Sequence, residues 1–406
     1  MEKRQQSNYQ KRKTVSCGRK TKPTRAGKIS KKRKIMNNKV AIRKCAEYDA
    51  QKIFDIIAEI YKTTGGPDVK GKKVLVKPNI LGDNDPSKCV STHPAVVEAM
   101  IKYLQSNGAE VFVGDSPAIH TARFKADKCG IYHVCETTGA KWVNFNENSV
   151  EKNIDGSNIK IASIVDEVDL IISLPKFKNH ELMYFTGALK NTYGLIPGFA
   201  KAFQHGIYTD TNSFGKLIVE LNKVITPHYF FLDAIMGMEG QGPGVHGTPV
   251  DIGVLIGSTN PLALDIMACK IAGYKSETLP VNKIALSEKQ WLQSAEEIEY
   301  DGPALETIKK EGFKKIPVST SRNIAMQFIM GRIRFLRKLE RRPVFIYDKC
   351  SGCLKCVKIC PVRAIQSSAS DSKRIKLTDK KCIRCFCCAE VCQDNAINIK
   401  VKIFGV

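Results

Sequence analysis

The chain has 406 residues, of which 43% are hydrophobic and 26% are charged, and its formal net charge is +24. This composition is ordinary for a folded protein of two or three domains. The chain has neither a run of about 20 apolar residues nor a secretory signal, which predicts a cytoplasmic protein without a transmembrane segment.

Much of the positive charge lies at the start of the chain. The first 39 residues hold 15 Lys and Arg against one acid, Glu2, and the first 35 have few aliphatic side chains. We therefore expect residues 1–35 to form a disordered basic tail. One alternative is translation from Met36, which would make this segment an untranslated leader. Another is a basic arm that attracts nucleic acid. Since the segment lacks a recognition motif, no specific nucleic-acid partner is expected.

Residues 36–318 consist of strands that alternate with helices. Strands are expected at 39–45, 73–76, 110–114, 159–165, 169–174, 228–232 and 252–257, and helices near 49–62, 93–107, 213–225 and 260–273. Strands that are apolar throughout are buried on both faces, as in parallel sheets. The predicted fold class is α/β, with a mostly parallel twisted sheet and helices on both of its faces.

Polar side chains follow several of these strands at the point where each ends. Lys77 and Asn79 follow the second strand, and Asp115 and Ser116 follow the third. Ligands of open α/β sheets bind beyond the carboxyl ends of the strands. A shared cleft explains these strand ends better than separate charged loops do, although surface loops around an ordinary core remain the alternative.

The stretch 174–198 (LPKFKNHELMYFTGALKNTYGLIPG) is the most informative part of this region. Lysine ammonium groups bind phosphate or carboxylate groups, and Lys201 and His205 extend the set. Nearby carboxylates suit a divalent cation as a further cofactor. We therefore predict a small anionic substrate. The candidate catalytic residues are Lys176, Lys178, His180, Lys190 and Asp233, and the further carboxylates are Glu239 and Asp265.

One apparent motif is rejected. Residues 242–247 match the dinucleotide pattern G-x-G-x-x-G, but they lead into the apolar strand at 252–257. The dinucleotide motif must instead open a helix directly after a strand. We interpret these glycines as a flexible loop over the cleft.

Residues 319–342 are expected to form a basic amphipathic connector helix. Phe328 and Leu336 represent its apolar side, and Arg332 and Arg337 its charge. Such a helix can lie on an anionic membrane, but packing of its apolar side on the body is the commoner outcome.

Nine of the 15 cysteines fall within a C-terminal segment, residues 343–406, where the spacing C-x2-C-x2-C-x3-C occurs twice with an offset of 32 residues. The first run is Cys350, Cys353, Cys356 and Cys360, and the second is Cys382, Cys385, Cys388 and Cys392. Zinc sites also use C-x2-C pairs, but the third and fourth cysteines of each run fit zinc ribbons poorly. The spacing favours iron–sulfur clusters.

This segment resembles the bacterial-type ferredoxins, a small α+β domain with two 4Fe–4S clusters. In that family the fourth cysteine of each run binds the other cluster. Cys387 aligns with Lys355 in the repeat and is not an expected ligand, and Gln393 replaces the usual proline. The resemblance implies two ligand sets, namely Cys350, Cys353, Cys356 and Cys392 for one cluster and Cys382, Cys385, Cys388 and Cys360 for the other.

Residues 36–318 resemble the DUF362 family, whose members often carry a C-terminal ferredoxin pair. The matching segments are KPN at 77–79, GDS at 114–116, LPKFKNH at 174–180 and NPLALD at 260–265. The combined expectation is an iron–sulfur protein that transfers electrons to or from a redox partner protein, with a redox enzyme as the leading hypothesis. The alternatives are an electron carrier with a non-catalytic docking domain and a basic-tailed nucleic-acid binder.

We predict about eight irons and eight acid-labile sulfides per chain in protein isolated without oxygen, as two four-iron clusters require. Cys360→Ser should damage one cluster, whereas Cys387→Ser should leave the iron content unchanged. Iron analysis and visible absorbance test both statements. Stoichiometric zinc without visible absorbance would contradict the first, and equal iron loss in the two variants would contradict the ligand assignment.

Overall fold

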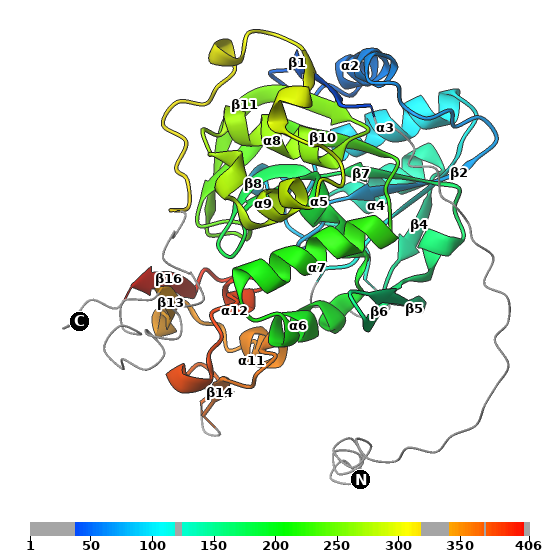
Figure 1. The fold of residues 1–406 in the computed structure, drawn as a ribbon. Helices are drawn as coiled ribbons and strands as arrows, with labels where there is room; N and C mark the ends of the chain where they lie inside the picture. Colours follow the sequence, from blue (N-terminus) through cyan, green and yellow to red (C-terminus); the bar gives the residue numbers. More distant parts are fainter. Residues whose placement is uncertain (1–36, 118–123, 318–340, 369–370, 402–406) are drawn as a thin grey trace, which may run out of the picture. The chain divides into compact units, whose positions relative to one another are not determined.

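The computed structural model describes residues 37–117, 124–317, 341–368 and 371–401 (Figure 1). Its central sheet runs in the order β12-β1-β11-β10-β7-β2-β3-β4, and β8 and β9 extend it from β10. The strands of this sheet are β1 (Lys39–Lys44), β2 (Lys73–Pro78), β3 (Glu110–Asp115), β4 (Lys141–Asn144), β7 (Leu170–Leu174), β8 (Lys176–His180), β9 (Tyr184–Thr186), β10 (Tyr229–Gly240), β11 (Gly247–Ser258) and β12 (Glu299–Asp301).

Most neighbours in this sheet are parallel, as the apolar strands predicted. The pairs from β10 through β7, β2 and β3 to β4 are all parallel. Strand β11 pairs antiparallel with both β10 and β1, and β9 pairs antiparallel with β8. The α/β fold class is therefore confirmed, with two antiparallel strands, β9 and β11, that the sequence did not indicate.

Helices cover both faces of the sheet (Figure 1). Alternate strand residues point to opposite faces, so that Phe230 and Leu232 pack in one apolar core and Tyr229 and Phe231 in the other. Helices α2, α3 and α4 cover the second core, and α5, α7, α8 and α9 the first. Their bounds are α2 (Ala50–Thr63), α3 (Pro94–Ser106), α4 (Ile131–Thr138), α5 (Ala188–Asn191), α6 (Gly198–Ile207), α7 (Thr211–Val224), α8 (Pro261–Ile271) and α9 (Pro280–Ser287).

Two expected elements differ from the structure. The strand expected at 159–165 is β6 (Ser157–Ala162), which pairs with β5 (Ser149–Ile154) in a separate two-stranded sheet and then gives way to a 3₁₀ turn. Most of the connector helix expected at 319–342 lies outside the described residues. Its last two residues, Arg341 and Arg342, are described and begin a strand instead. Among the described residues, no helix has both the length and the hydropathy to cross a membrane.

The described residues from 341 onward, which we call the cysteine module, have a small apolar core of their own. Two short antiparallel strand pairs, β13 with β16 and β14 with β15, flank two short helices. Residues 37–317, which we call the body, belong to the same compact unit as the module. The module's elements are β13 (Arg341–Phe345), α11 (Lys355–Ile359), β14 (Ile365–Ser367), β15 (Ile375–Leu377), α12 (Cys387–Glu390) and β16 (Ile397–Val401).

Candidate functional site

A buried ion pair joins the carboxyl ends of two neighbouring parallel strands. Lys77 near the end of β2 lies 2.9 Å from Asp115 at the end of β3, and both side chains are at most 3% exposed. The Asp115 carboxylate also accepts hydrogen bonds from the backbone of Ile80 and Ser116. Burial lowers the pKa of Lys77, and the Asp115 charge opposes that shift. The pair therefore holds the two strand ends together without a net charge.

Lys178 of β8 is buried, and no carboxylate of the described residues forms an ion pair with it. Its ammonium donates to Asn79 Oδ1 at 2.7 Å and to the Val90 carbonyl at 2.6 Å. Asn79 in turn donates to Asn191 Oδ1, which also accepts from Lys77. Burial, assisted by the charge of Lys190, lowers the pKa of Lys178 to about 7. Lys178 thus links the Lys77 pair to strand β8.

Lys176 and Asp233 form a second buried ion pair, 2.7 Å apart and at most 1% exposed. The Tyr48 hydroxyl accepts from Lys176 and donates to Asp233, and the His93 backbone N–H donates to the same carboxylate. The rings of Tyr48 and His93 stack at 3.5 Å. Every charge in this group has a partner inside the body, so its geometry is that of a structural link between β8 and β10.

A cavity of about 80 Å³ lies between the strand ends of the body and the cysteine module. We call it the boundary cavity. This volume exceeds that of a single water site and suits a small molecule or ion. The lining residues that carry polar groups come from both sides of the cavity and are Asn79, Asp115, Ser116, His180, Lys190, Asn191, Tyr193, Lys201, His205, Cys387 and Glu390.

Two lysines of this cavity have ammonium groups that make no hydrogen bond or ion pair with the described residues. Within the described part of the chain, the ammonium groups of Lys190 and Lys201 take part in no hydrogen bond or ion pair. Lys190 lies 5.6 Å from the ring centroid of Tyr193. Burial lowers the pKa of both lysines, and that of Lys201 falls to about 7 although Asp115 opposes the shift. An anion in the cavity would supply the missing partner.

His180 and Glu390 meet across the same cavity. His180 Nδ1 accepts hydrogen bonds from the backbone of Leu182 and Met183, so the ring proton lies on Nε2. That nitrogen is 3.4 Å from Glu390 Oε1. Burial together with the neighbouring Lys190 charge lowers the pKa of His180 well below its usual value, so the ring is neutral.

His205 presents a second neutral imidazole to the boundary cavity. Burial and the Lys190 charge lower its pKa to about 3. Its ring stacks on Phe214 at 4.2 Å, and no hydrogen bond reaches its Nδ1 atom within the described residues. The cavity therefore offers two charged donors and a ring nitrogen without a partner.

The cysteines of the module line two further small cavities. The one we call thiol cavity A is lined by Cys350, Cys353, Cys356 and Cys392. The one we call thiol cavity B is lined by Cys360, Cys382, Cys385, Cys388 and Cys387. Each cavity draws its cysteines from both runs of the repeat. Cys387 lines the boundary cavity as well, so thiol cavity B and the boundary cavity share a wall.

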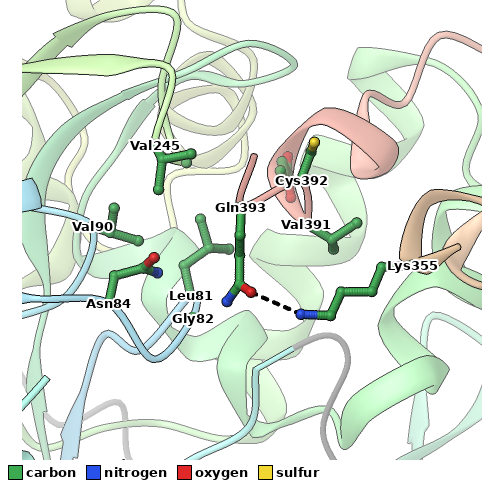
Figure 2. Close-up of a pocket in the computed structure, with 11 residues that line it drawn as sticks. Leu81, Gly82, Asn84, Val90, Val245, Lys355, Val391, Cys392 and Gln393 are labelled. Carbon is green, nitrogen blue, oxygen red and sulfur yellow. Dashed lines mark hydrogen bonds between the residues drawn. The ribbon is translucent and has the colours of Figure 1, made fainter. Parts of the chain in front are cut away.

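A smaller space beside thiol cavity A also lies between body and module (Figure 2). Leu81, Val90 and Val245 line it from the body. On the module side, Lys355 donates to Gln393 Oε1 at 2.9 Å. Gln393 occupies the place of a proline in the repeat, and this bond joins the two cysteine runs at that point.

Several contacts attach the module to the body. Arg341 lies 2.5 Å from Glu181, which follows β8. The loop at 242–246, expected to be flexible, joins the antiparallel strands β10 and β11, and a Cβ built on Gly244 would lie 3.1 Å from the Glu390 carbonyl. Helix α6 meets the module near Pro361. The turn between two strands also agrees with rejection of a dinucleotide motif.

The structure divides the candidate residues into two groups. His180 and Lys190 line the boundary cavity, whereas Lys176, Lys178 and Asp233 lie behind it in closed hydrogen-bond networks. Their catalytic roles stay predictions. The sequence did not indicate Tyr48 or Glu390, because neither has a motif and each reaches the region only through the fold.

The carboxylates proposed for a divalent cation have other partners. Asp265 accepts from the backbone N–H groups of Ala188 and Leu189, and burial raises its pKa to about 7. Glu239 pairs with Lys314. Among the described residues, no group of three or more His, Cys, Asp or Glu side chains is placed to hold a single metal ion.

Residues 74–270 match the profile of a domain of unknown function, DUF362, and residues 342–393 match that of a 4Fe–4S dicluster domain. The thylakoid-associated protein sll1697 of Synechocystis sp. is 33% identical over 250 residues, which are 60% of this chain and 78% of that protein.

Two solved structures are similar at low identity. The lactate racemase apoprotein from Thermoanaerobacterium thermosaccharolyticum has a TM-score of 0.41 and 12% identity over 57% of this chain and 56% of its own. A structural-genomics protein from Thermotoga maritima has a TM-score of 0.33 and 16% identity over 49% of this chain and 53% of its own. The chain thus spans little more than half of either one.

Asp233→Asn should lower the free energy of unfolding by about 3 kcal/mol or more, because it leaves the Lys176 ammonium buried without its counter-charge. Urea unfolding measures the change. Lys176→Met combined with Asp233→Asn should recover part of the loss, since the uncompensated charge is then gone. An unchanged unfolding midpoint in Asp233→Asn would show that this pair is not the structural link described above.

Proposed function

Because the chain belongs to the DUF362 family and ends in a 4Fe–4S dicluster domain, we propose that it is an iron–sulfur redox enzyme. Its substrate is a small anion that binds in the boundary cavity. The observation that carries this proposal is the composition of one cavity. Lys190 and Lys201, whose ammonium groups make no hydrogen bond or ion pair with the described residues, line it together with Cys387 of α12.

The two thiol cavities would each hold a four-iron cluster. A cluster of this type needs four thiolates around one space, and each cavity is lined by four cysteines at the spacing of the repeat. The donor set therefore fits. Cys387 is the fifth cysteine of thiol cavity B, and its position in the repeat argues for a role other than ligation. When bound, the clusters supply electrons one at a time.

Lys190 and Lys201 would bind the anion directly, because their charges have no partner among the described residues. The backbone and neutral side chains of the cavity would orient it, with His205 as an additional polar contact. Lys201 and His205 are at most 8% exposed, so charge attraction beside Lys201 is screened less than in bulk water. Lys176, Lys178 and Asp233 would act indirectly, by holding the strands that carry these groups.

Glu390 limits which anions fit. It is the module's carboxylate in the cavity, and burial raises its pKa while Lys190 and Lys178 oppose that shift. An anion bound beside Lys190 would compete with Glu390 for the same positive charge. The site therefore favours ligands that are small enough to reach the lysines without approaching the carboxylate.

Replacement of the unpaired lysines should weaken anion binding. We expect Lys190→Met and Lys201→Met each to reduce the affinity for sulfate about tenfold, as loss of one charge-assisted hydrogen bond implies. Isothermal titration calorimetry under anaerobic conditions measures this affinity. Lys102→Met, an exposed change on α3, is the matched control and should bind sulfate as the unaltered chain does.

Iron content and thermal stability should stay unchanged in both variants, because neither ammonium supports another group of the protein. Sulfate affinities equal to that of the control would contradict the assignment of the boundary cavity. If the cavity binds no anion while the clusters accept electrons, the chain is better described as an electron carrier with a docking body.

Sulfate affinity should also fall as the pH rises above about 7, the lowered pKa of Lys201. Below this pH the ammonium is charged and attracts the anion, and above it the neutral amine does not. The bound anion stabilises the charged form, so the midpoint should lie somewhat above 7. Sulfate keeps its charge through this range, and Lys201→Met should flatten the profile. A profile that is already flat in the unaltered chain would contradict this prediction.

A further inference from the structure

The two thiol cavities differ in their surroundings. Thiol cavity B shares Cys387 with the boundary cavity, whereas the lining residues of thiol cavity A include none of the residues that line the boundary cavity. Among the described cysteines, Cys353 of thiol cavity A alone is exposed. The module thus has one end that faces the substrate site and one end that faces the solvent.

Exposed aromatic and charged side chains lie close to the exposed cysteine, and the acidic Asp348 is among them. Tyr347 is 53% exposed, and Lys349 between it and Cys353 is exposed as well. Gly352, with a φ of +76°, allows the cysteine loop to lie against Lys373, whose Cγ is 3.4 Å from a Cβ built at that glycine.

A hydrogen bond fixes the arrangement of this surface. The Tyr347 hydroxyl donates to the Ile375 carbonyl at 3.0 Å, which joins the segment before the first cysteine run to β15. Lys373 precedes that strand by two residues and is exposed. Four side chains, Tyr347, Lys349, Cys353 and Lys373, therefore form one surface, which we call the docking face.

The charge of the module indicates the kind of partner. Residues 341–400 hold 13 Lys and Arg and five Asp and Glu, a formal excess of eight positive charges. Basic surfaces accelerate encounters with acidic proteins, and exposed aromatic side chains are frequent at the centres of protein interfaces. Neither lysine of the docking face has an ion-pair partner among the described residues.

We propose that the docking face binds an acidic one-electron carrier protein and that electrons travel from the Cys353 side of the module to the Cys387 side. This inference rests on the proposed function, because it requires cluster-loaded thiol cavities. In each transfer the carrier loses one electron and the module gains one, and no atom or proton moves. Reduction of the substrate by an electron pair needs two such transfers.

The test uses the full chain with its clusters and reduced bacterial flavodoxin, an acidic one-electron carrier, as the probe. Lys349→Glu combined with Lys373→Glu reverses two charges of the docking face. Lys44→Glu combined with Lys70→Glu reverses two exposed charges of the body and is the matched control. Stopped-flow absorbance measures cluster reduction, and zero-length carbodiimide cross-linking followed by mass spectrometry locates the contact.

Flavodoxin should reduce the docking-face variant about tenfold more slowly than the unaltered chain at low ionic strength, and added salt should remove the difference. The control variant should behave as the unaltered chain does. Cross-links should join flavodoxin carboxylates to Lys349 or Lys373. Equal rates in the two double variants, or cross-links confined to other lysines, would overturn the proposal.

Reduced methyl viologen distinguishes failure of the docking proposal from failure of the proposed function, because this small cation reduces clusters without binding to a basic surface. It should reduce all three proteins at similar rates. If viologen reduces the clusters but the docking-face charges have no effect on flavodoxin, the docking proposal fails and the proposed function stands. If viologen reduces none of the three proteins, the proposed function fails, and the docking proposal that rests on it fails as well.

Discussion

The burial of lysine ammonium groups at the carboxyl edge of the sheet is the constraint on which the site depends. A charge removed from water must be paired or hydrogen-bonded, because its desolvation costs several kcal/mol. Lys77 and Lys176 satisfy this requirement with carboxylates at hydrogen-bonding distance. Lys190 and Lys201 do not, within the described residues. The lysine charges at the strand ends are thus neutralised by carboxylates, whereas the lysine charges that face the boundary cavity are not.

Lysines that look alike in the sequence therefore have different roles, because some are paired with carboxylates and others face the cavity. The lysines at 176, 178 and 190 lie close together in the chain, yet the first two share one face of β8, whereas Lys190 lies on α5. The first two stabilise strand ends, and the third faces the cavity. The cysteine module completes that cavity with Glu390 and Cys387, so neither part of the chain forms the site alone.

Much of the architecture could be predicted from the sequence, because buried strands and amphipathic helices have distinct periods. The strands at 73–78, 110–115 and 170–174 agree with their predicted positions to within two residues. The antiparallel placement of β11 could not be predicted, since an apolar strand reads the same in either direction. The two cysteine runs were indicated by their spacing, and the resemblance to ferredoxins implied how they divide into two sets. The partners of Lys176 and the cavity that Lys190 lines depend on long-range packing that no local pattern records.

The shared wall between the cavities has a consequence for how the protein responds to damage. The segment from Cys385 to Glu390 supplies three of the five cysteines of thiol cavity B and two groups of the boundary cavity. Loss of iron that disordered this short segment would open the cavity to solvent and expose Lys190 to water. Under the proposed function, oxygen treatment would then abolish anion binding together with electron transfer, so a damaged copy would not retain the proposed anionic substrate.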